Sequence, residues 1–459
     1  MATYEPNIES LRQHTTPTWY KDAKIGIYTH WGPYSVPAFD NEWYAAKMYD
    51  PATPHIYNHH RATWGDMGYK DFIPMFRAEN WDPEHWADLF KRAGAKFAGP
   101  VVEHHDGFAM YACSHNRWNC VEMGPKRDIT AEQKKATEAV GMKFIVTSHR
   151  AQNARYYYTN PAGSDRSDPQ YYDLYAKPLA DWNAHADEEF LKDWLRRTIE
   201  VLDKYEPDVL WFDGGWHHPE FLPYRFELVS YYYNKAVEWG KEVVLNSKDH
   251  VFDGASVYNI ERGQTAGIKE EYWQTDTSVS VNSWGFRENE RYKSVIQVIH
   301  TMIDIVSKNG NMLLNVGPRA DGTIPLEAEG ILLAMGEWLE VNGEAIYGSR
   351  HWERFGEGPT PTLGQWNEGR WEAYTHRDFR FTQKPGALYA IVMGWPGLET
   401  RITSLATGSG IDAANITSVT MLGIDRPLEW KQDHRGLHVT MPDHRPCDHA
   451  YTIKVALKR

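Results

Sequence analysis

The chain has 459 residues, a length that suits one large domain followed by a smaller one. Hydrophobic residues make up 42% of the chain and charged residues 24%, so it can bury a substantial core and is not intrinsically disordered. The formal net charge of −13 repels phosphate groups, which argues against nucleic acids and anionic membranes as partners.

The first ten residues, MATYEPNIES, show neither the basic start nor the apolar stretch of a signal peptide. No later segment approaches the roughly 18 consecutive apolar residues of a membrane-spanning helix. Three cysteines are too few for a disulfide framework, and no CxxC pair indicates a zinc site. We therefore expect a cytoplasmic protein, unless a leader has been removed from the chain.

Short β-rich runs alternate with helical patterns over the first three quarters of the chain. The predicted strands are Ile25–Trp31, Phe97–Glu103, Lys143–Ser148, Val209–Asp213, Glu242–Asn246, Ser256–Ile260 and Asn311–Val316. A helix begins at Asp82-Pro83 and ends at Gly94, and apolar residues recur at helical spacing over 190–202 and 299–306. Repeated β-then-α units without a Gly-rich dinucleotide fingerprint predict a (β/α)8-like TIM barrel over residues 1–348.

The sequence after residue 348 has a different texture. Residues 349–459 are dense in Gly, Pro and Thr, with short alternating runs at Arg370–Thr375, Ala387–Met393 and Tyr451–Val455. This pattern predicts a C-terminal antiparallel β-sandwich.

The ends of the predicted barrel strands carry the polar residues expected of an active site, because catalytic groups of TIM barrels lie at the carboxyl ends of the strands. His30 ends the first strand, His104 and His105 the second, and Asp213 the fourth, whereas the strand interiors are apolar. Imidazoles, carboxylates and aromatic rings gathered at one mouth indicate a site for a polar, ring-shaped ligand.

Other interpretations of these residues stay open at this point. His30 could be a core histidine, and Asp213 could be a buried carboxylate that caps the next segment. Several His with Asp and Glu could bind a metal, but the paired spacings HxH and HExxH are missing, so we predict neither a metal nor a cofactor.

The fourth strand favours Asp213 as a catalytic nucleophile. Glycosidases usually place two carboxyl groups beside the scissile bond, about 5 Å apart in the retaining type. Asp213 follows an apolar run, and the two glycines after it leave room for a substrate. Glu261 is our first choice for the second carboxyl group, with Glu270 and Glu271 in reserve. The alternative for Glu261 is an exposed loop residue paired with Arg262.

Seven segments in order resemble the glycoside hydrolase family 29 α-L-fucosidases. These segments are 19–38, Glu42-Trp43-Tyr44, His104-His105-Asp106-Gly107-Phe108, Gly124-Pro125-Lys126-Arg127-Asp128, Leu210-Trp211-Phe212-Asp213-Gly214, Ser283-Trp284-Gly285-Phe286, and 308–318. The resemblance implies a (β/α)8-like catalytic domain with a C-terminal β-sandwich. It also implies retaining, metal-independent hydrolysis of terminal α-L-fucose from oligosaccharides or glycoconjugates.

The resemblance assigns roles to individual positions. Asp213 is similar to the family's nucleophile, and the interval from Lys248 to Glu261 is similar to the one that precedes its acid/base. The residues similar to those that bind the fucose hydroxyls are His30, Glu42, Trp43, His104 and His105, and those similar to aromatic walls are Trp211 and Trp284. Such hydroxyl contacts confer specificity, because an analogue without the hydroxyl leaves a buried polar group unpaired.

Two positions depart from the family pattern. Many members have Asn-Asp-Arg after the fifth strand, where this chain has Asn246-Ser247-Lys248. Many members also have Tyr-Tyr-Ser at the end of the third strand, where this chain has no tyrosine and His149 follows Ser148. We expect Lys248 and His149 to take over these sugar contacts, although Lys248 lacks the bidentate geometry of Arg. A fucose-binding protein without catalysis, and fucosyl transfer in place of hydrolysis, stay open as alternatives.

Overall fold

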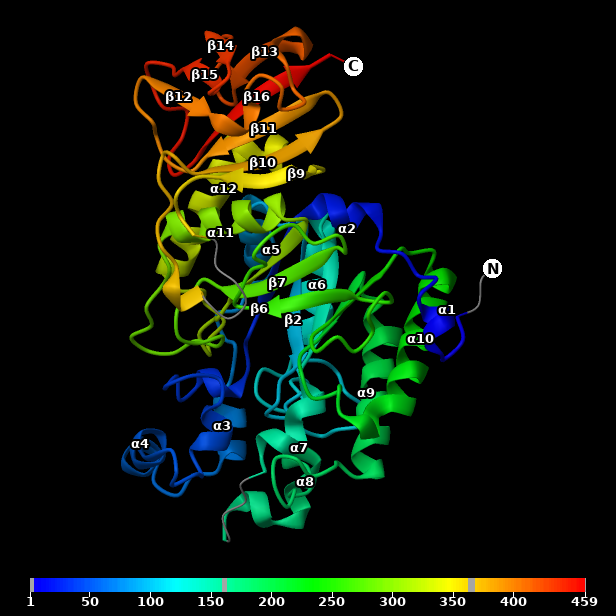
Figure 1. The fold of residues 1–459 in the computed structure, drawn as a ribbon. Coiled ribbons are helices and arrows are strands. Elements are labelled where there is room, and N and C mark those ends of the chain that lie inside the picture. Colours follow the sequence, from blue (N-terminus) through cyan, green and yellow to red (C-terminus); the bar gives the residue numbers. More distant parts are fainter. Residues whose placement is uncertain (1–3, 159–162, 362–367, 459) are drawn as a thin grey trace.

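The computed structural model describes residues 4–158, 163–361 and 368–458. A closed eight-stranded parallel barrel forms its lower and middle part, and two antiparallel sheets lie above it in Figure 1. The barrel strands are β1 Ile25–Thr29, β2 Phe97–Glu103, β3 Lys143–Ser148, β4 Val209–Phe212, β5 Val244–Ser247, β6 Val257–Glu261, β7 Trp273–Ser278 and β8 Gly310–Val316. The predicted fold class is therefore confirmed.

Helices cover the barrel at most of the crossovers between its strands. The α-helices are α1 Ile8–Leu11, α2 Thr18–Ala23, α3 Tyr44–Lys47, α4 Pro54–Trp64, α5 Pro83–Arg92, α6 Ile129–Ala139, α7 Asn153–Tyr156, α8 Tyr172–Tyr175, α9 Glu188–Tyr205, α10 Leu222–Trp239, α11 Val295–Ser307 and α12 Leu326–Ile346. Residues 248–256 and 262–272 form turns instead, because these links are shorter than the dozen or more residues that a crossover helix needs. None of the helices in the described residues is long and apolar enough to cross a membrane.

The seven predicted barrel strands form with ends shifted by at most two residues, but β7 was missed. Its sequence, WQTDTS, contains one apolar residue, yet all six residues are buried. Their polar groups are paired inside the barrel: Gln274 donates to Asn259 Oδ1 at 2.8 Å, and Thr275 donates to the Gly263 carbonyl at 2.6 Å. A strand whose polar side chains are satisfied by neighbouring strands has no hydrophobic pattern to reveal it.

The C-terminal part packs two antiparallel sheets around an apolar core, as predicted. One sheet has the order β13-β16-β11-β10-β9 and the other β12-β15-β14. Their strands are β9 Arg350–Glu357, β10 Phe379–Lys384, β11 Ala387–Val392, β12 Glu399–Ile402, β13 Ile416–Met421, β14 Trp430–Asp433, β15 Gly436–Thr440 and β16 Tyr451–Leu457.

One strand predicted in this part is absent, since residues 371–375 are irregular. Tyr374 is instead buried against the barrel, with its hydroxyl 3.5 Å from Asp304 of α11. The larger sheet rests on α11 and α12 (Figure 1). Arg380 of β10 and Lys308 both pair with the buried Asp304, which joins the sheet to the barrel by charge as well as by packing.

Candidate active site

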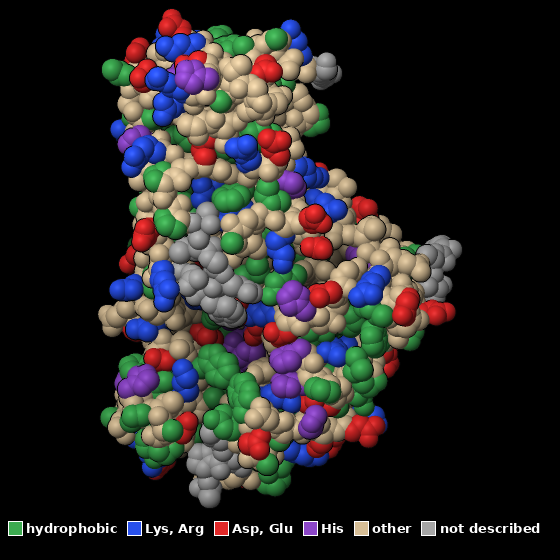
Figure 2. All heavy atoms as spheres, viewed as in Figure 1, with side chains coloured by type: hydrophobic (Ala, Val, Ile, Leu, Met, Phe, Trp, Pro, Cys, Tyr) green, Lys and Arg blue, Asp and Glu red, His purple; other side chains and the backbone are tan. Residues whose placement is uncertain are grey.

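The carboxyl ends of the barrel strands surround a cavity of about 120 Å³. Its lining consists of Tyr28, His30, Glu42, Trp43, His104, His105, His149, Trp211, Asp213, Lys248, Glu261, Asp276 and Trp284. Most of the ionisable ones end a strand or directly follow one, which is why residues far apart in the sequence meet here. Figure 2 shows acidic, basic and histidine side chains gathered in a hollow below β6 and β7 of Figure 1.

Asp213 follows β4 and is held as an anion by its neighbours. Its Oδ1 accepts a hydrogen bond from Lys248, and its Oδ2 lies 3.1 Å from His105 Nε2 and 3.8 Å from His149 Nε2. Burial raises the pKa of Asp213, but the Lys248 ammonium, together with the hydrogen bond from His105, outweighs burial and holds that pKa well below 3.8. The carboxylate is therefore ionised, as a nucleophile must be.

His105 faces a hydrogen-bond acceptor on each side of its ring. Nδ1 lies 2.7 Å from the carbonyl oxygen of His149, and Nε2 faces the Asp213 carboxylate. The ring thus bridges the loop that follows β3 and the Asp213 carboxylate.

Lys248 joins the two carboxyl groups of the site. Its Nζ, besides contacting Asp213, donates to Glu261 Oε2 at 2.6 Å and lies 5.2 Å from the ring centre of Trp211. Burial lowers the pKa of Lys248, but Asp213 and Glu261 outweigh it and raise that pKa well above 10.5. Because one ammonium contacts both carboxylates, their nearest oxygens are at most two hydrogen-bond lengths apart.

Aromatic rings and a buried carboxylate form the walls of the cavity. Glu42, which is 5% exposed, accepts from the Trp284 amide at 2.9 Å and from Ser283 Oγ at 3.1 Å, and so anchors the loop after β7. The Trp284 ring lies against His30 with centroids 5.4 Å apart, and Trp43 lies 5.5 Å from His105. These walls are flat and apolar with polar groups between them, which suits a sugar ring.

The other three histidines of the cavity are neutral. Burial lowers the pKa of His30 to about 3, and it lowers the pKa values of His104 and His149 well below 6.5. A neutral imidazole offers one N–H donor and one lone pair, so each ring can exchange hydrogen bonds with a hydroxyl or ligate a metal ion.

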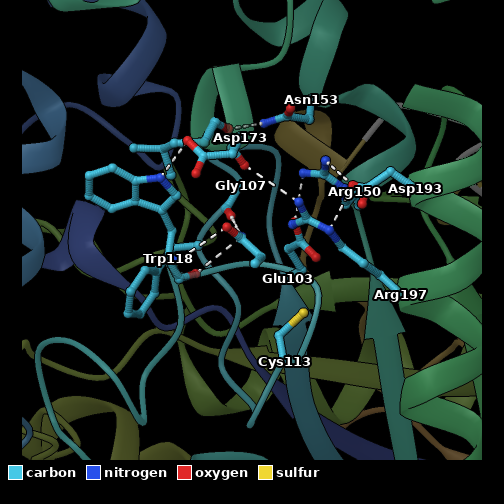
Figure 3. Close-up of polar contacts among 12 residues, drawn as sticks. Glu103, Gly107, Cys113, Trp118, Arg150, Asn153, Asp173, Asp193 and Arg197 are labelled. Atoms are coloured by element: carbon cyan, nitrogen blue, oxygen red, sulfur yellow. Dashed lines mark hydrogen bonds and ion pairs between the residues drawn. The ribbon is translucent and has the colours of Figure 1, made fainter. Parts of the chain in front are cut away.

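A buried network of charges joins residues next to the histidines in the chain (Figure 3). Glu103 Oε1, at the end of β2, accepts from Arg150 at 2.8 Å and from Arg197 at 3.2 Å. Asp193 Oδ2 completes the network at 2.8 Å from Arg150 and 2.7 Å from Arg197. Because Glu103 precedes His104 and Arg150 follows His149, this network ties together the two strand ends that carry the histidines.

The turn after Asp213 requires a glycine at position 215 for a reason different from the predicted one. Gly215 has φ +99°, and a Cβ there would lie 2.5 Å from Gln152 Oε1 and 2.9 Å from the backbone of Ala151. The glycine thus makes room for the neighbouring strand's loop, whereas the sequence had suggested room for substrate.

The structure brings the predicted catalytic pair and all nine predicted substrate-binding residues into this one cavity. Glu261 pairs with Lys248 rather than with Arg262, whose guanidinium instead stacks on Trp284 at 4.3 Å. The reserve residues Glu270 and Glu271 precede β7 and line a separate cavity of about 610 Å³ at the opposite end of the barrel. They are too far along the barrel to meet Asp213.

Two residues of the cavity, Tyr28 and Asp276, were missed by the sequence analysis. Asp276 belongs to the unrecognised β7, and Tyr28 lies inside β1, where the strand was taken to be purely structural. The alternation of side chains along β1 could have indicated Tyr28, because it lies two residues before His30 and therefore points to the same face of the strand.

Comparison with known proteins agrees with the fold and the motifs. The family model for alpha-L-fucosidase matches residues 1–344, and the model for the alpha-L-fucosidase C-terminal domain matches residues 373–456. The human tissue alpha-L-fucosidase is 30% identical over 98% of this chain and 91% of its own length.

A solved structure of similar sequence covers the whole molecule. The alpha-fucosidase of Thermotoga maritima in complex with fucose is 31% identical, with a TM-score of 0.80 over 99% of this chain and 100% of that one. The same enzyme in complex with a mechanism-based inhibitor also has a TM-score of 0.80, at 30% identity. By sequence and by fold, this chain belongs to the α-L-fucosidases of glycoside hydrolase family 29.

Proposed function

We propose that this protein is a retaining exo-α-L-fucosidase in which Asp213 is the nucleophile and Glu261 is the acid/base. The observation that carries the proposal is the contact of one ammonium, that of Lys248, with both carboxylates inside a cavity lined by histidines and tryptophans. Two carboxyl groups within two hydrogen-bond lengths are compatible with the roughly 5 Å separation of retaining glycosidases and too close for the inverting type.

In the first step, an Asp213 oxygen attacks the anomeric carbon while the bond from that carbon to the leaving oxygen breaks. Glu261 gives its proton to the leaving oxygen, and fucose stays bound to Asp213 as an ester. In the second step, Glu261 takes a proton from water, the water oxygen attacks the anomeric carbon, and the bond to Asp213 breaks.

Lys248 serves both steps through its charge, and His105 supports the first step through its hydrogen bond to Asp213. Before the first step they stabilise Asp213 as an anion. Once Asp213 is esterified its negative charge is gone, so Lys248 is left beside Glu261 and favours the carboxylate form that accepts a proton from water. The same ammonium thus supports the nucleophile first and the base afterwards.

The neutral histidines and Glu42 supply the hydroxyl contacts under this proposal. His30 and His104 each present a donor or a lone pair to the cavity, while His149 stands where many family members have a tyrosine. Trp43, Trp211 and Trp284 form the walls. A 2-deoxy or epimeric sugar would leave one of these buried groups unpaired.

Release of 4-nitrophenol from 4-nitrophenyl α-L-fucoside tests the nucleophile. Asp213→Ala is expected to lower kcat/KM by about 10⁴-fold or more, because the covalent route is closed. Asp249→Ala is the matched control, since Asp249 is an exposed carboxylate that pairs with His217 outside the cavity. Near-wild-type turnover by Asp213→Ala would reject the assignment. Fucose binding without turnover in the wild type would identify a binding protein, and fucosylated acceptors as the main products would identify a transferase.

Leaving-group dependence tests the acid/base. Glu261→Ala is expected to impair an unactivated oligosaccharide far more than 4-nitrophenyl α-L-fucoside, because an acidic phenol departs without protonation. Azide should partly restore the rate by attacking the fucosyl ester and should yield the azide with retained configuration. An equal loss on both substrates, with no rescue, would exclude Glu261 from this role.

A further inference from the structure

Three histidines from adjacent strands converge at the floor of the cavity. His30, His104 and His149 follow β1, β2 and β3, which are neighbours in the barrel. One nitrogen atom from each ring lies within 4.8 Å of the other two, and the ring centroids are 5.0 to 5.5 Å apart. All three side chains are almost completely buried, at 2 to 3% exposure.

The hydrogen bonds around these rings leave their ligating atoms available. Asn315 donates through its amide nitrogen to Ser278 Oγ and to the Trp284 carbonyl, which fixes its oxygen as the acceptor facing His30 Nδ1 at 2.8 Å. His30 therefore carries its proton on Nδ1 and has its lone pair on Nε2. Within residues 4–158, 163–361 and 368–458, the Nδ1 atoms of His104 and His149 have no hydrogen-bond partner.

Three neutral imidazoles that each bring a nitrogen atom within 4.8 Å of the other two are a ligand set that zinc and other late divalent metals prefer. The charges nearby favour a cation as well, because the carboxylates of Asp213 and Glu261 share the cavity with the ammonium of Lys248. Asp213 Oδ2 is 3.8 Å from His149 Nε2, close enough to compensate the charge of an ion on the three rings. Tetrahedral Zn²⁺ with Zn–N bonds of about 2.0–2.1 Å would draw the three rings closer together than the 4.8 Å limit of their present spacing and would leave the fourth position to water.

We propose that His30, His104 and His149 form a binding site for Zn²⁺, and that Zn²⁺ and the sugar compete for it. The competition rests on the proposed function, in which the same ring nitrogens contact fucose hydroxyls. From the sequence, a metal at these histidines is an alternative that we reject, because each ligand comes from a different strand and no two have the spacing of a metal motif.

Calorimetric titration with ZnCl₂ tests the site directly, using untagged full-length protein first dialysed against a chelator. The wild type is expected to bind one equivalent, and His149→Phe and His104→Phe should each weaken the Kd by about tenfold or more. Phenylalanine keeps a ring in place and removes the nitrogens, and near-UV circular dichroism identifies the variants that remain folded. Co²⁺ gives a second readout, because nitrogen ligation in a four-coordinate site intensifies its visible absorption.

The matched control is the double variant His217→Gln/His218→Gln. These two histidines stack on each other at 4.3 Å on the loop after β4, outside the cavity lining, and offer an alternative pair of imidazoles for a metal. Zinc affinity should be unchanged in this variant. Zinc binding that survives both phenylalanine substitutions, or that is lost in the control, would overturn the proposal, as would a wild type that binds no zinc.

Kinetics then test the competition. Zn²⁺ should raise the KM for 4-nitrophenyl α-L-fucoside without changing kcat, and L-fucose should weaken the calorimetric zinc affinity. A purely noncompetitive effect of Zn²⁺ would contradict a shared site. Because the titration needs no turnover, zinc binding by a wild type that releases no 4-nitrophenol would support the metal site while rejecting the fucosidase function.

Discussion

Asp276 lies inside the barrel, where Tyr28 donates to one of its carboxyl oxygens at 3.3 Å and Asn259 to the other at 2.5 Å. Burial raises the pKa of Asp276 from 3.8 to about 7, against the opposing effect of Lys248. A carboxyl group with a raised pKa in the folded protein stabilises it fully below about pH 3.8, and this contribution is lost as the pH rises to about 7.

Asp276→Asn should therefore gain stability relative to the wild type as the pH rises. The difference in free energy of unfolding is expected to grow between pH 4 and 7 by up to about 4 kcal/mol and then to level off, since each pKa unit corresponds to about 1.4 kcal/mol. Urea unfolding at a series of pH values measures it. Asp88→Asn, on the exposed face of α5, should shift stability by a constant amount, and a flat difference for Asp276→Asn would contradict the buried, protonated carboxyl group.

At the scale of secondary-structure elements, the ends of β2 and β3 are joined to α9 by Glu103, Arg150, Asp193 and Arg197. The side chains of Glu103 and of both arginines are at most 4% exposed, so each charge depends on its partners in place of water. The network also determines where His105 and His149 stand beside Asp213. Stability and activity should therefore fall together when it is broken.

Glu103→Gln leaves Asp193 to offset both arginines, so that one buried positive charge of the network is uncompensated, which typically costs about 3–5 kcal/mol. Chemical denaturation should show this loss, and kcat/KM should fall because His105 loses its support. Glu138→Gln breaks a surface pair with Lys134 on α6 and should change stability by less than about 1 kcal/mol. Equal effects of the two substitutions would show that the network is not a source of stability.

At the scale of the whole molecule, a residue beyond the barrel braces the active site. Glu368 lies after β9 and reaches back to Lys293 at 2.6 Å and to Arg262 at 3.5 Å. Arg262 follows Glu261 and stacks on Trp284, so Glu368 is one contact away from the proposed acid/base and from an aromatic wall. The C-terminal part therefore contributes to the site, beyond covering α11 and α12.

Glu368→Gln should lower both stability and kcat/KM, because Lys293 and Arg262 lose a nearly buried carboxylate that offsets their charge. Active-site titration with a fluorinated fucosyl fluoride measures the fraction of folded, competent enzyme. The loss of kcat/KM should remain after the rate is corrected for that fraction. Glu372→Gln, on the exposed side of the same segment, is the control. An activity loss shared by both variants would point to a general effect of the segment.

Much of the molecule follows from the sequence alone. Seven barrel strands, the sandwich, and the strand ends carrying His30, His104, His105 and Asp213 could be predicted, because apolar strand interiors with polar ends are a local pattern. The family motifs extended this to Glu42, Trp43 and Trp284. A TIM barrel gathers the residues at the carboxyl ends of its strands at one mouth, so their place in the site follows from their place in the strands.

Which side chains contact one another was decided only by the tertiary structure. β7 escaped prediction because its polar groups are satisfied across strands, and Asp276 escaped with it. The choice of Glu261 over Glu270 and Glu271 depends on which end of the barrel each one occupies, and the pairing of Lys248 with two carboxylates joins residues from three strands. A sequence records what each strand end carries, whereas distances between strand ends arise only when the barrel closes.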